Sequence, residues 1–345
     1  MSSIDGVSEQ ASAMSGTATG SDTGALAVRL FGWIMLAATA AFVLNNYLTY
    51  WLDLPGVAPL FGGTANGSAD PAMSVVQLGI YALLVALAGG HALRQRGRPL
   101  RTDSRRIAAI NGFVIRAAFF AVLSVGLTDA VISFLRVEGL LDSLVGSPLA
   151  TELGRSRFRG PYVHMPLIGL SIILAAFTRT LGFIWLALLV VAAELLIVLG
   201  RFIFSYEQAF MADLVRFWYA ALFLFASAYT LWEEGHVRVD VFYAAFSTRT
   251  KGYVNSVGAV FLGMSLCWTI LIIGMGSKQA IINAPMLAYE TTQAGFGLYV
   301  KYLMAGFLGV FAVSMLIQFV AYLFDAVADI RGEPGARNTS SGAAH

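Results

Sequence analysis

The residues that could do chemistry in this 345-residue sequence are ionisable side chains within or beside long apolar runs. Glu194 lies near the middle of one such run, and Arg201 follows seven residues later on the same face of a helix. Asp213 and Arg216 open the next run, which also contains Trp218. Ionisable groups at membrane depth are costly and usually face other protein, so these side chains are candidates for an ion site or a helix contact.

A compact polar turn follows the run that contains Trp218. We interpret this turn as a structural connection whose charges pair with one another, rather than as a catalytic site. Glu194 is interpreted as a packing contact that needs a partner donor, since a carboxylate without a second acidic group nearby in sequence is weak evidence for ion transport. The candidate structural and interface residues are Glu194, Arg201, Asp213, Arg216, Trp218, His236, Arg238 and Asp240. Arg116 and Asp129, on another apolar run, are given a structural role as well.

No pattern in the sequence is typical of a catalytic, cofactor or metal site. A glycine-rich phosphate loop and an HExxH motif are both absent. The only cysteine, Cys267, excludes a disulfide within one chain, and the four histidines include no pair on one predicted helix. We therefore expect a protein that is not an enzyme and that holds no cofactor or metal.

The composition indicates a membrane protein. Hydrophobic residues make up 58% of the chain and charged residues 12%, with a mean hydropathy of +0.73; soluble domains carry about 25% charged residues. About 20 apolar residues cross a hydrocarbon core of about 30 Å as a helix. The candidate spans are Ala25–Trp51, Val75–Leu93, Ile107–Leu135, Tyr162–Phe177, Leu181–Phe204, Phe210–Trp232, Tyr253–Met275 and Leu298–Phe324. The sequence thus predicts an all-α integral membrane protein with about eight transmembrane helices.

The fourth span is short and has Pro166 in its first turn, so a re-entrant segment is the alternative there.

The distribution of Lys and Arg predicts that both termini are cytoplasmic. With this orientation, 13 basic residues fall in cytoplasmic segments and 5 in outer segments. The cytoplasmic set is Arg29, Arg94, Arg96, Arg98, Arg101, Arg105, Arg106, Arg179, Arg238, Arg249, Lys251, Arg331 and Arg337, and the outer set is Arg136, Arg155, Arg157, Arg159 and Lys278.

The chain divides into four predicted parts. Residues 1–24 are small and polar, lack the pattern of a secretory signal, and are expected to be a disordered tail. Residues 25–177 form a four-helix extension, and residues 178–330 form a second four-helix group after the short turn Thr178–Thr180. Residues 331–345 form a disordered C-terminal tail. Ala305, Gly309 and Ala312 share one face of the last span, which offers a surface for association with a partner helix.

Short motifs in the second group occur in a defined order. The first span of the group ends in Arg201-Phe202-Ile203-Phe204, and Asp213-Leu214-Val215-Arg216 opens the next, with Trp218 following. The inside loop contains His236-Val237-Arg238-Val239-Asp240, and an outer loop over Glu290–Leu298 precedes the last helix. In these motifs the second group resembles the small membrane subunit of the tripartite ATP-independent periplasmic (TRAP) transporters.

The resemblance implies a secondary transporter of organic acids, usually driven by sodium. In such a system a periplasmic solute-binding protein captures the substrate, and a large permease subunit carries the substrate and ion sites. The small subunit braces the permease and helps to dock the binding protein. The resemblance thus implies these two proteins and the lipid bilayer as partners, no nucleic acid, and a place in the bacterial inner membrane. The alternative is a stand-alone carrier or channel, which would need polar residues along one path through the bundle.

Overall fold

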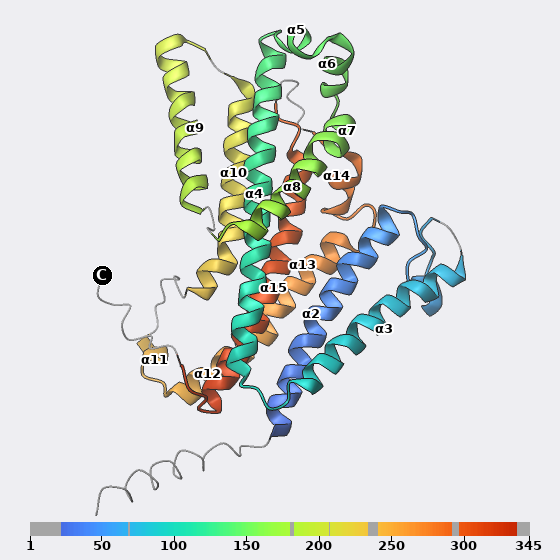
Figure 1. The fold of residues 1–345 in the computed structure, drawn as a ribbon, viewed down its shortest axis with the longest axis vertical. Helices are drawn as coiled ribbons and strands as arrows, with labels where there is room; N and C mark the ends of the chain where they lie inside the picture. The colour runs from blue at the N-terminus through green and yellow to red at the C-terminus, as the bar shows by residue number, and fades with distance from the viewer. Residues whose placement is uncertain are drawn as a thin grey trace, which may run out of the picture.

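A computed structural model describes residues 22–67, 70–179, 183–206, 208–233, 241–291 and 297–336. Every regular element in these ranges is helical (Figure 1). Eight helical stretches within them are long and apolar enough to cross a membrane. The prediction of an all-α membrane protein with eight spans is confirmed, whereas the side on which the termini lie stays a prediction.

The eight spans consist of single helices or of helices joined end to end. They are α2 (Asp22–Tyr50), α3 (Pro71–Arg94), α4 (Leu100–Val137), α7 (Ser156–Arg159) with the π-helical segment η2 (Gly160–His164) and α8 (Met165–Phe177), α9 (Phe183–Phe204), α10 (Ala209–Trp232), α12 (Thr248–Gly258) with the π-helical segment η3 (Ala259–Met264) and α13 (Ser265–Met275), and α15 (Lys301–Ile330). The short helices are η1 (Ala58–Phe61), α5 (Leu141–Val145), α6 (Ser147–Leu153), α11 (Val241–Ala244) and α14 (Asn283–Ala288).

Local sequence explains where some of these helices begin. The carboxylate of Asp70 accepts a hydrogen bond of 2.9 Å from the backbone N–H of Ala72, and Pro71 occupies the first helical position of α3. Ser247 caps α12 in the same way, through the N–H of Thr250. The fourth span begins at Ser156, earlier than predicted, because the chain is already helical before Pro166.

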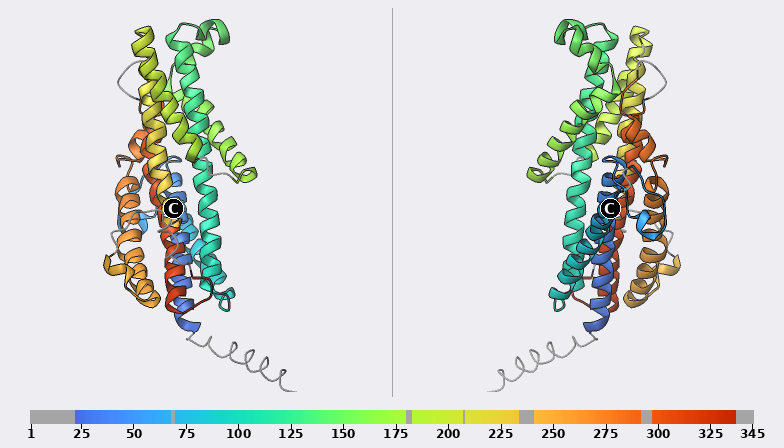
Figure 2. Two further views of the ribbon diagram at one scale, coloured as in Figure 1. Left: turned by 90° about the vertical axis from the view of Figure 1, so that its left-hand side faces the viewer. Right: turned by 90° about the vertical axis from the view of Figure 1, so that its right-hand side faces the viewer.

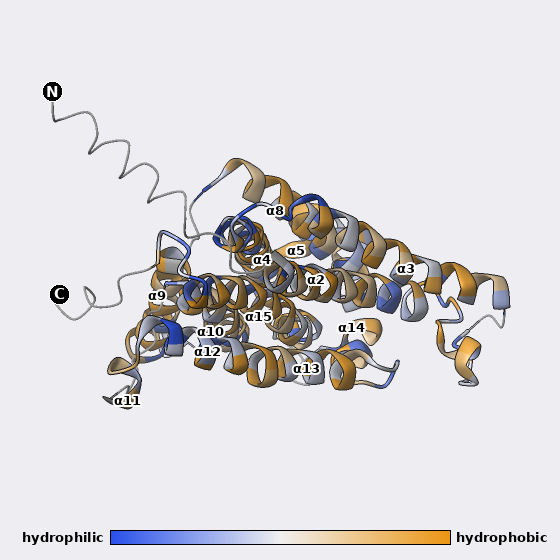
Figure 3. Cartoon of the chain, turned by 90° about the horizontal axis from the view of Figure 1, so that it is seen from below, coloured by the Kyte–Doolittle hydropathy of each residue, from blue (hydrophilic) through white to orange (hydrophobic). Residues whose placement is uncertain are grey.

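The helices α4 and α15 pack against each other along the centre of the bundle (Figure 1). The helices α2 and α3 lie beside the lower part of this pair, and α9 lies beside its upper part. Edge-on views show that the bundle is thin relative to its length (Figure 2). Viewed from below, the long helices are predominantly hydrophobic (Figure 3). The helical layers therefore present apolar side chains over much of their surface, as expected in a bilayer.

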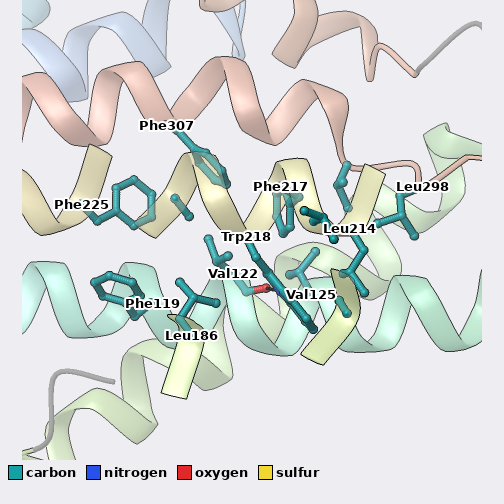
Figure 4. Close-up of a cluster of buried hydrophobic side chains, with 14 of the residues drawn as sticks. Phe119, Val122, Val125, Leu186, Leu214, Phe217, Trp218, Phe225, Leu298 and Phe307 are labelled. Atoms are coloured by element: carbon teal, nitrogen blue, oxygen red, sulfur yellow. Dashed lines mark hydrogen bonds between the residues drawn. The ribbon is translucent and has the colours of Figure 1, made fainter. Parts of the chain in front are cut away.

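Two hydrophobic clusters are built along the central pair. The first joins α4, α9, α10 and the start of α15 through residues such as Phe119, Trp218 and Phe307 (Figure 4). The second joins α2, the opposite end of α4, η3, α13 and the rest of α15. Because α4 contributes to both clusters, packing crosses the predicted boundary at residue 178; the boundary itself stays a prediction.

At the lower end of the bundle, ion pairs join α2 and α15 to α4. Arg29 of α2 contacts Asp103 of α4 at 2.6 Å, and both side chains are buried. Arg101 of α4 contacts Asp329 of α15 at 2.8 Å and Asp325 at 3.5 Å. Charges in an apolar layer require such partners, so these contacts fix α2 and α15 against α4.

Of the small residues of the last span, Ala312 lies inside the chain, whereas Ala305 and Gly309 are partly exposed. Ala312 is fully buried in the second cluster. Gly309 lines an apolar groove beside Met275 of α13. The expectation that this stripe faces a partner helix is therefore wrong for Ala312, because α15 is the central helix of its own chain.

Candidate functional site

A buried polar cluster lies at the upper end of the central pair and is centred on Asp129 of α4. One carboxylate oxygen, Oδ1, accepts a hydrogen bond of 2.7 Å from Nη1 of Arg159 and lies 3.1 Å from Nε2 of His164. The other oxygen, Oδ2, accepts a hydrogen bond of 2.8 Å from the backbone N–H of Tyr299. The side chains of Asp129, Arg159 and His164 have no exposed surface.

The cluster extends from His164 into α15. The Nδ1 atom of His164 lies 2.8 Å from the hydroxyl of Tyr302, and the two rings are stacked. Nη1 of Arg159 also donates to the hydroxyl of Ser133 at 3.2 Å. Three segments of the chain therefore meet at one carboxylate: α4, the junction of α7 and η2, and the stretch before α15. His164 links this carboxylate to α15.

Two guanidinium groups lie over the ring of Tyr299. The Cζ atom of Arg159 is 4.4 Å from the ring centroid and that of Arg136 is 4.7 Å away. Nη1 of Arg136 also donates to the hydroxyl of Tyr299. Nη2 of Arg159 is buried without an acceptor among the described residues. Cation–π contacts of this kind stabilise a positive charge where water is excluded.

The π-helical segment η2 positions the cluster. In an α-helix, residues five apart point to different faces, yet Arg159 and His164 both reach Asp129. The backbone N–H of Met165 bonds to the carbonyl of Gly160, five residues back, and this wider turn brings the two side chains together. Gly160 is required here, since a Cβ atom would overlap the ring of Tyr289.

The arrangement is suited to holding segments together rather than to chemistry. Asp129 and Arg159 balance each other's charge, and neither has surface that a substrate could reach. From the sequence, Asp129 was given a structural role and Arg159 was counted among the basic residues of the outer segments, without a partner. Arg159 lies in α7, at the start of the fourth span, and its side chain is buried. Because Asp129 and Arg159 are far apart in sequence, only the fold shows that they pair.

Of the residues predicted from the motifs, Asp213 and Trp218 make contacts inside the chain. Oδ2 of Asp213 accepts a hydrogen bond of 3.3 Å from the backbone N–H of Leu298, and Oδ1 lies 3.5 Å from Nη1 of Arg216. Trp218 is buried, and its indole N–H donates to the carbonyl of Val122 in α4 at 3.3 Å. The side chain of Arg216 is 72% exposed, so its pairing with Asp213 is weak.

The other predicted residues are not brought together. Glu194 and Arg201 are both exposed on α9. His236, Arg238 and Asp240 lie outside the described residues. The proposed roles of all eight residues therefore stay predictions.

An apolar groove of about 500 Å³ lies between α4, α8, α13 and α15. Side chains such as Ile168, Met275 and Phe307 line it. No group of three His, Cys, Asp or Glu side chains in the described ranges could hold a metal ion. The groove is suited to a hydrocarbon chain rather than to a charged solute.

Residues 190–329 match a family model described as tripartite ATP-independent periplasmic transporters, DctQ component. The matched range runs from α9 to the last turn of α15 and confirms the resemblance predicted from the motifs. Comparisons with curated proteins and with solved structures gave no match. Together with the eight apolar helices, the family match identifies a multi-pass protein of the inner membrane with a part in transport.

Proposed function

We infer that this chain, whose residues 190–329 match the DctQ component, is the small membrane subunit of a TRAP transporter for organic acids. In this proposal the coupling ion is sodium, and the substrate and ion sites belong to a large permease subunit. The present chain braces that permease. The single observation that carries the proposal is the family match, which covers α9 to α15.

The charges inside the bundle support a bracing role. Asp129, Arg159, Arg29 and Asp103 are buried and paired within the chain, and they join helices rather than line a path. The groove of about 500 Å³ is apolar and offers no donors for an organic acid. These features favour a supporting subunit over a stand-alone carrier.

The upper end of the molecule supports the proposed docking of a solute-binding protein. The short helices α5 and α6 cap this end of α4 (Figure 1). At the end of α6, Glu152 forms an exposed ion pair of 2.7 Å with Arg155. If this end is periplasmic, as the distribution of basic residues predicts, this ion pair is available to a soluble partner.

The test is reconstitution of transport. The chain is co-expressed with a candidate large permease and a candidate solute-binding protein from the same genome, in a host that lacks uptake of organic acids. We expect uptake of a labelled organic acid that requires all three proteins and a sodium gradient. Uptake that is unchanged when this chain is omitted would contradict the proposal, and uptake that is unchanged without sodium would contradict only the coupling ion.

A further inference from the structure

The carboxylate of Glu194 is exposed at the middle of an apolar helix. Glu194 is the twelfth of the 22 residues of α9, so about 16 Å of helix lies on either side of it. Its side chain is exposed, and no donor among the described residues reaches it. A helix of this length crosses the hydrocarbon core, and Glu194 therefore lies near the middle of the bilayer.

An isolated carboxylate at this depth is costly in lipid and requires a donor or a cation. Two other carboxylates of the chain, those of Asp129 and Asp103, are each paired with a buried arginine. Glu194 lacks such a partner within the described part of the chain. A helix of another protein in the membrane could supply the partner that the described part of the chain does not.

The helix α9 is attached to the bundle along one side only. Leu186 and Ala193 are buried in the first cluster, whereas Val191 and Val198 are 63% and 47% exposed. Val191 and Val198 are three and four residues from Glu194, so all three share one face of the helix. This face combines apolar surface with one unpaired acceptor, the pattern by which polar residues join helices in membranes.

We propose that this face of α9, defined by Val191, Glu194 and Val198, docks onto a helix of the large permease subunit. The permease helix supplies a hydrogen-bond donor or a cationic side chain to Glu194 at the middle of the bilayer. The proposal rests on the proposed function, since it names the surface through which the small subunit contacts its permease. The family match describes one component of a tripartite transporter, so a helix of another component is the expected neighbour, and it can supply a donor that a lipid chain lacks.

The first experiment is site-specific photo-cross-linking in membranes that contain the full chain and the permease. A photoreactive amino acid replaces Val198, which lies on the proposed face. The matched control is the same replacement at Leu196, which is 61% exposed at nearly the same depth but points away from that face. We expect a cross-link to the permease from position 198 and none from position 196.

The second experiment tests the role of the carboxylate by co-purification of the permease. Glu194→Leu should reduce the recovered permease by about threefold to tenfold, the range for losing one polar contact between membrane helices. Glu194→Gln keeps an acceptor and should retain more permease than Glu194→Leu. The amount of each variant in the membrane is measured in parallel, and a leucine in an apolar helix is compatible with insertion.

The outcomes separate this inference from the proposed function. If the wild-type chain recovers the permease but position 198 forms no cross-link to it, or links two copies of this chain, the surface is wrong while the function stands. Permease recovery that is equal for wild type, Glu194→Gln and Glu194→Leu would also overturn the inference. If the wild-type chain fails to recover the permease at all, both the proposed function and the inference are overturned.

Discussion

At the scale of single residues, the carboxylates within the membrane spans are of two kinds, enclosed by partners or exposed. Asp129 is enclosed by Arg159, His164 and a backbone N–H, and it has no exposed surface. Glu194 is exposed and has no described partner. An enclosed charge stabilises the fold only as long as its partners remain, whereas an exposed charge at depth indicates a contact outside the chain.

We expect Asp129→Ala to destabilise the protein by about 3–5 kcal/mol, because it leaves Arg159 buried without a counterion. The free energy of unfolding of the purified protein in detergent is the measurement. The control is Glu152→Ala, which removes an exposed pair with Arg155 and should cost less than about 1 kcal/mol. Equal losses for the two variants would show that the buried cluster does not hold the upper end together.

The Asp213 and Arg216 pair should respond unequally to substitution. Asp213→Ala leaves the N–H of buried Leu298 without this acceptor, at a cost of about 1–3 kcal/mol. Arg216→Ala removes a mostly exposed partner and should cost less than about 1 kcal/mol. Uptake and yield of the assembled complex should fall more for Asp213→Ala. A larger loss for Arg216→Ala would instead indicate that the arginine contacts another subunit.

At the scale of helices, the contact between α4 and α10 depends on shape. Trp218 of α10 packs over Gly126 of α4 and donates to the carbonyl of Val122 (Figure 4). A Cβ atom at Gly126 would overlap the indole ring. The two helices therefore approach closely at Gly126, where α4 has no side chain, as is common for helices packed in membranes.

Gly126→Ala should therefore lower the unfolding free energy by about 1–3 kcal/mol, the cost of an overpacked contact. The matched control is Gly89→Ala in α3, where a Cβ atom meets no other atom within 4 Å and should be neutral or slightly stabilising. Combining Gly126→Ala with Trp218→Phe should cost less than the sum of the two single changes, since the smaller ring relieves the overlap. Additive losses would contradict this packing.

At the scale of the whole molecule, the spans are staggered along a central pair that is longer than the bilayer is thick. The 38 residues of α4 span about 57 Å, compared with a hydrocarbon core of about 30 Å. Membrane helices tilt by up to about 40°, and this tilt alone does not place all of α4 in the core. We therefore expect α4 to be tilted and to extend into water at one or both ends.

The predicted topology can be measured with reporter fusions. Fusions at Ala65, in the loop after α2, and at Arg101, near the start of α4, should report opposite sides of the membrane, with Arg101 on the cytoplasmic side. This expectation follows from the exposed arginines between α3 and α4, which include Arg94, Arg96 and Arg98. Reporters on the same side would show that α3 does not cross.

Removal of residues 1–177 should destabilise the remaining four-helix group. This deletion removes α4, which supplies Phe119, Val122 and Val125 to the first cluster and Asp129 to the upper polar cluster. We expect little of the fragment 178–345 in the membrane, and recovery when residues 1–177 are co-expressed as a separate chain. The expectation would be contradicted by a fragment that accumulates in the membrane and recovers as much permease as the full chain does. Residues 1–177 would then not be needed to stabilise the second four-helix group.

The class of the molecule follows from the amino-acid sequence alone. Long apolar runs specify membrane helices because unpaired backbone groups are excluded from hydrocarbon, and the number of spans follows from their lengths. The motifs around Arg201 and Asp213 were sufficient to indicate the family, because they are short and local in the chain.

The pairing of the buried charges, in contrast, depends on the packing of the helices. Asp129 and Arg159 are 30 residues apart, and the pairing of Asp129 with the N–H of Tyr299 spans 170 residues. Such contacts depend on how helices pack, and the apolar pattern of a membrane helix does not specify which of its faces meets lipid or protein. For the same reason the sequence placed Glu194 within a span, while the fold showed that its face is exposed.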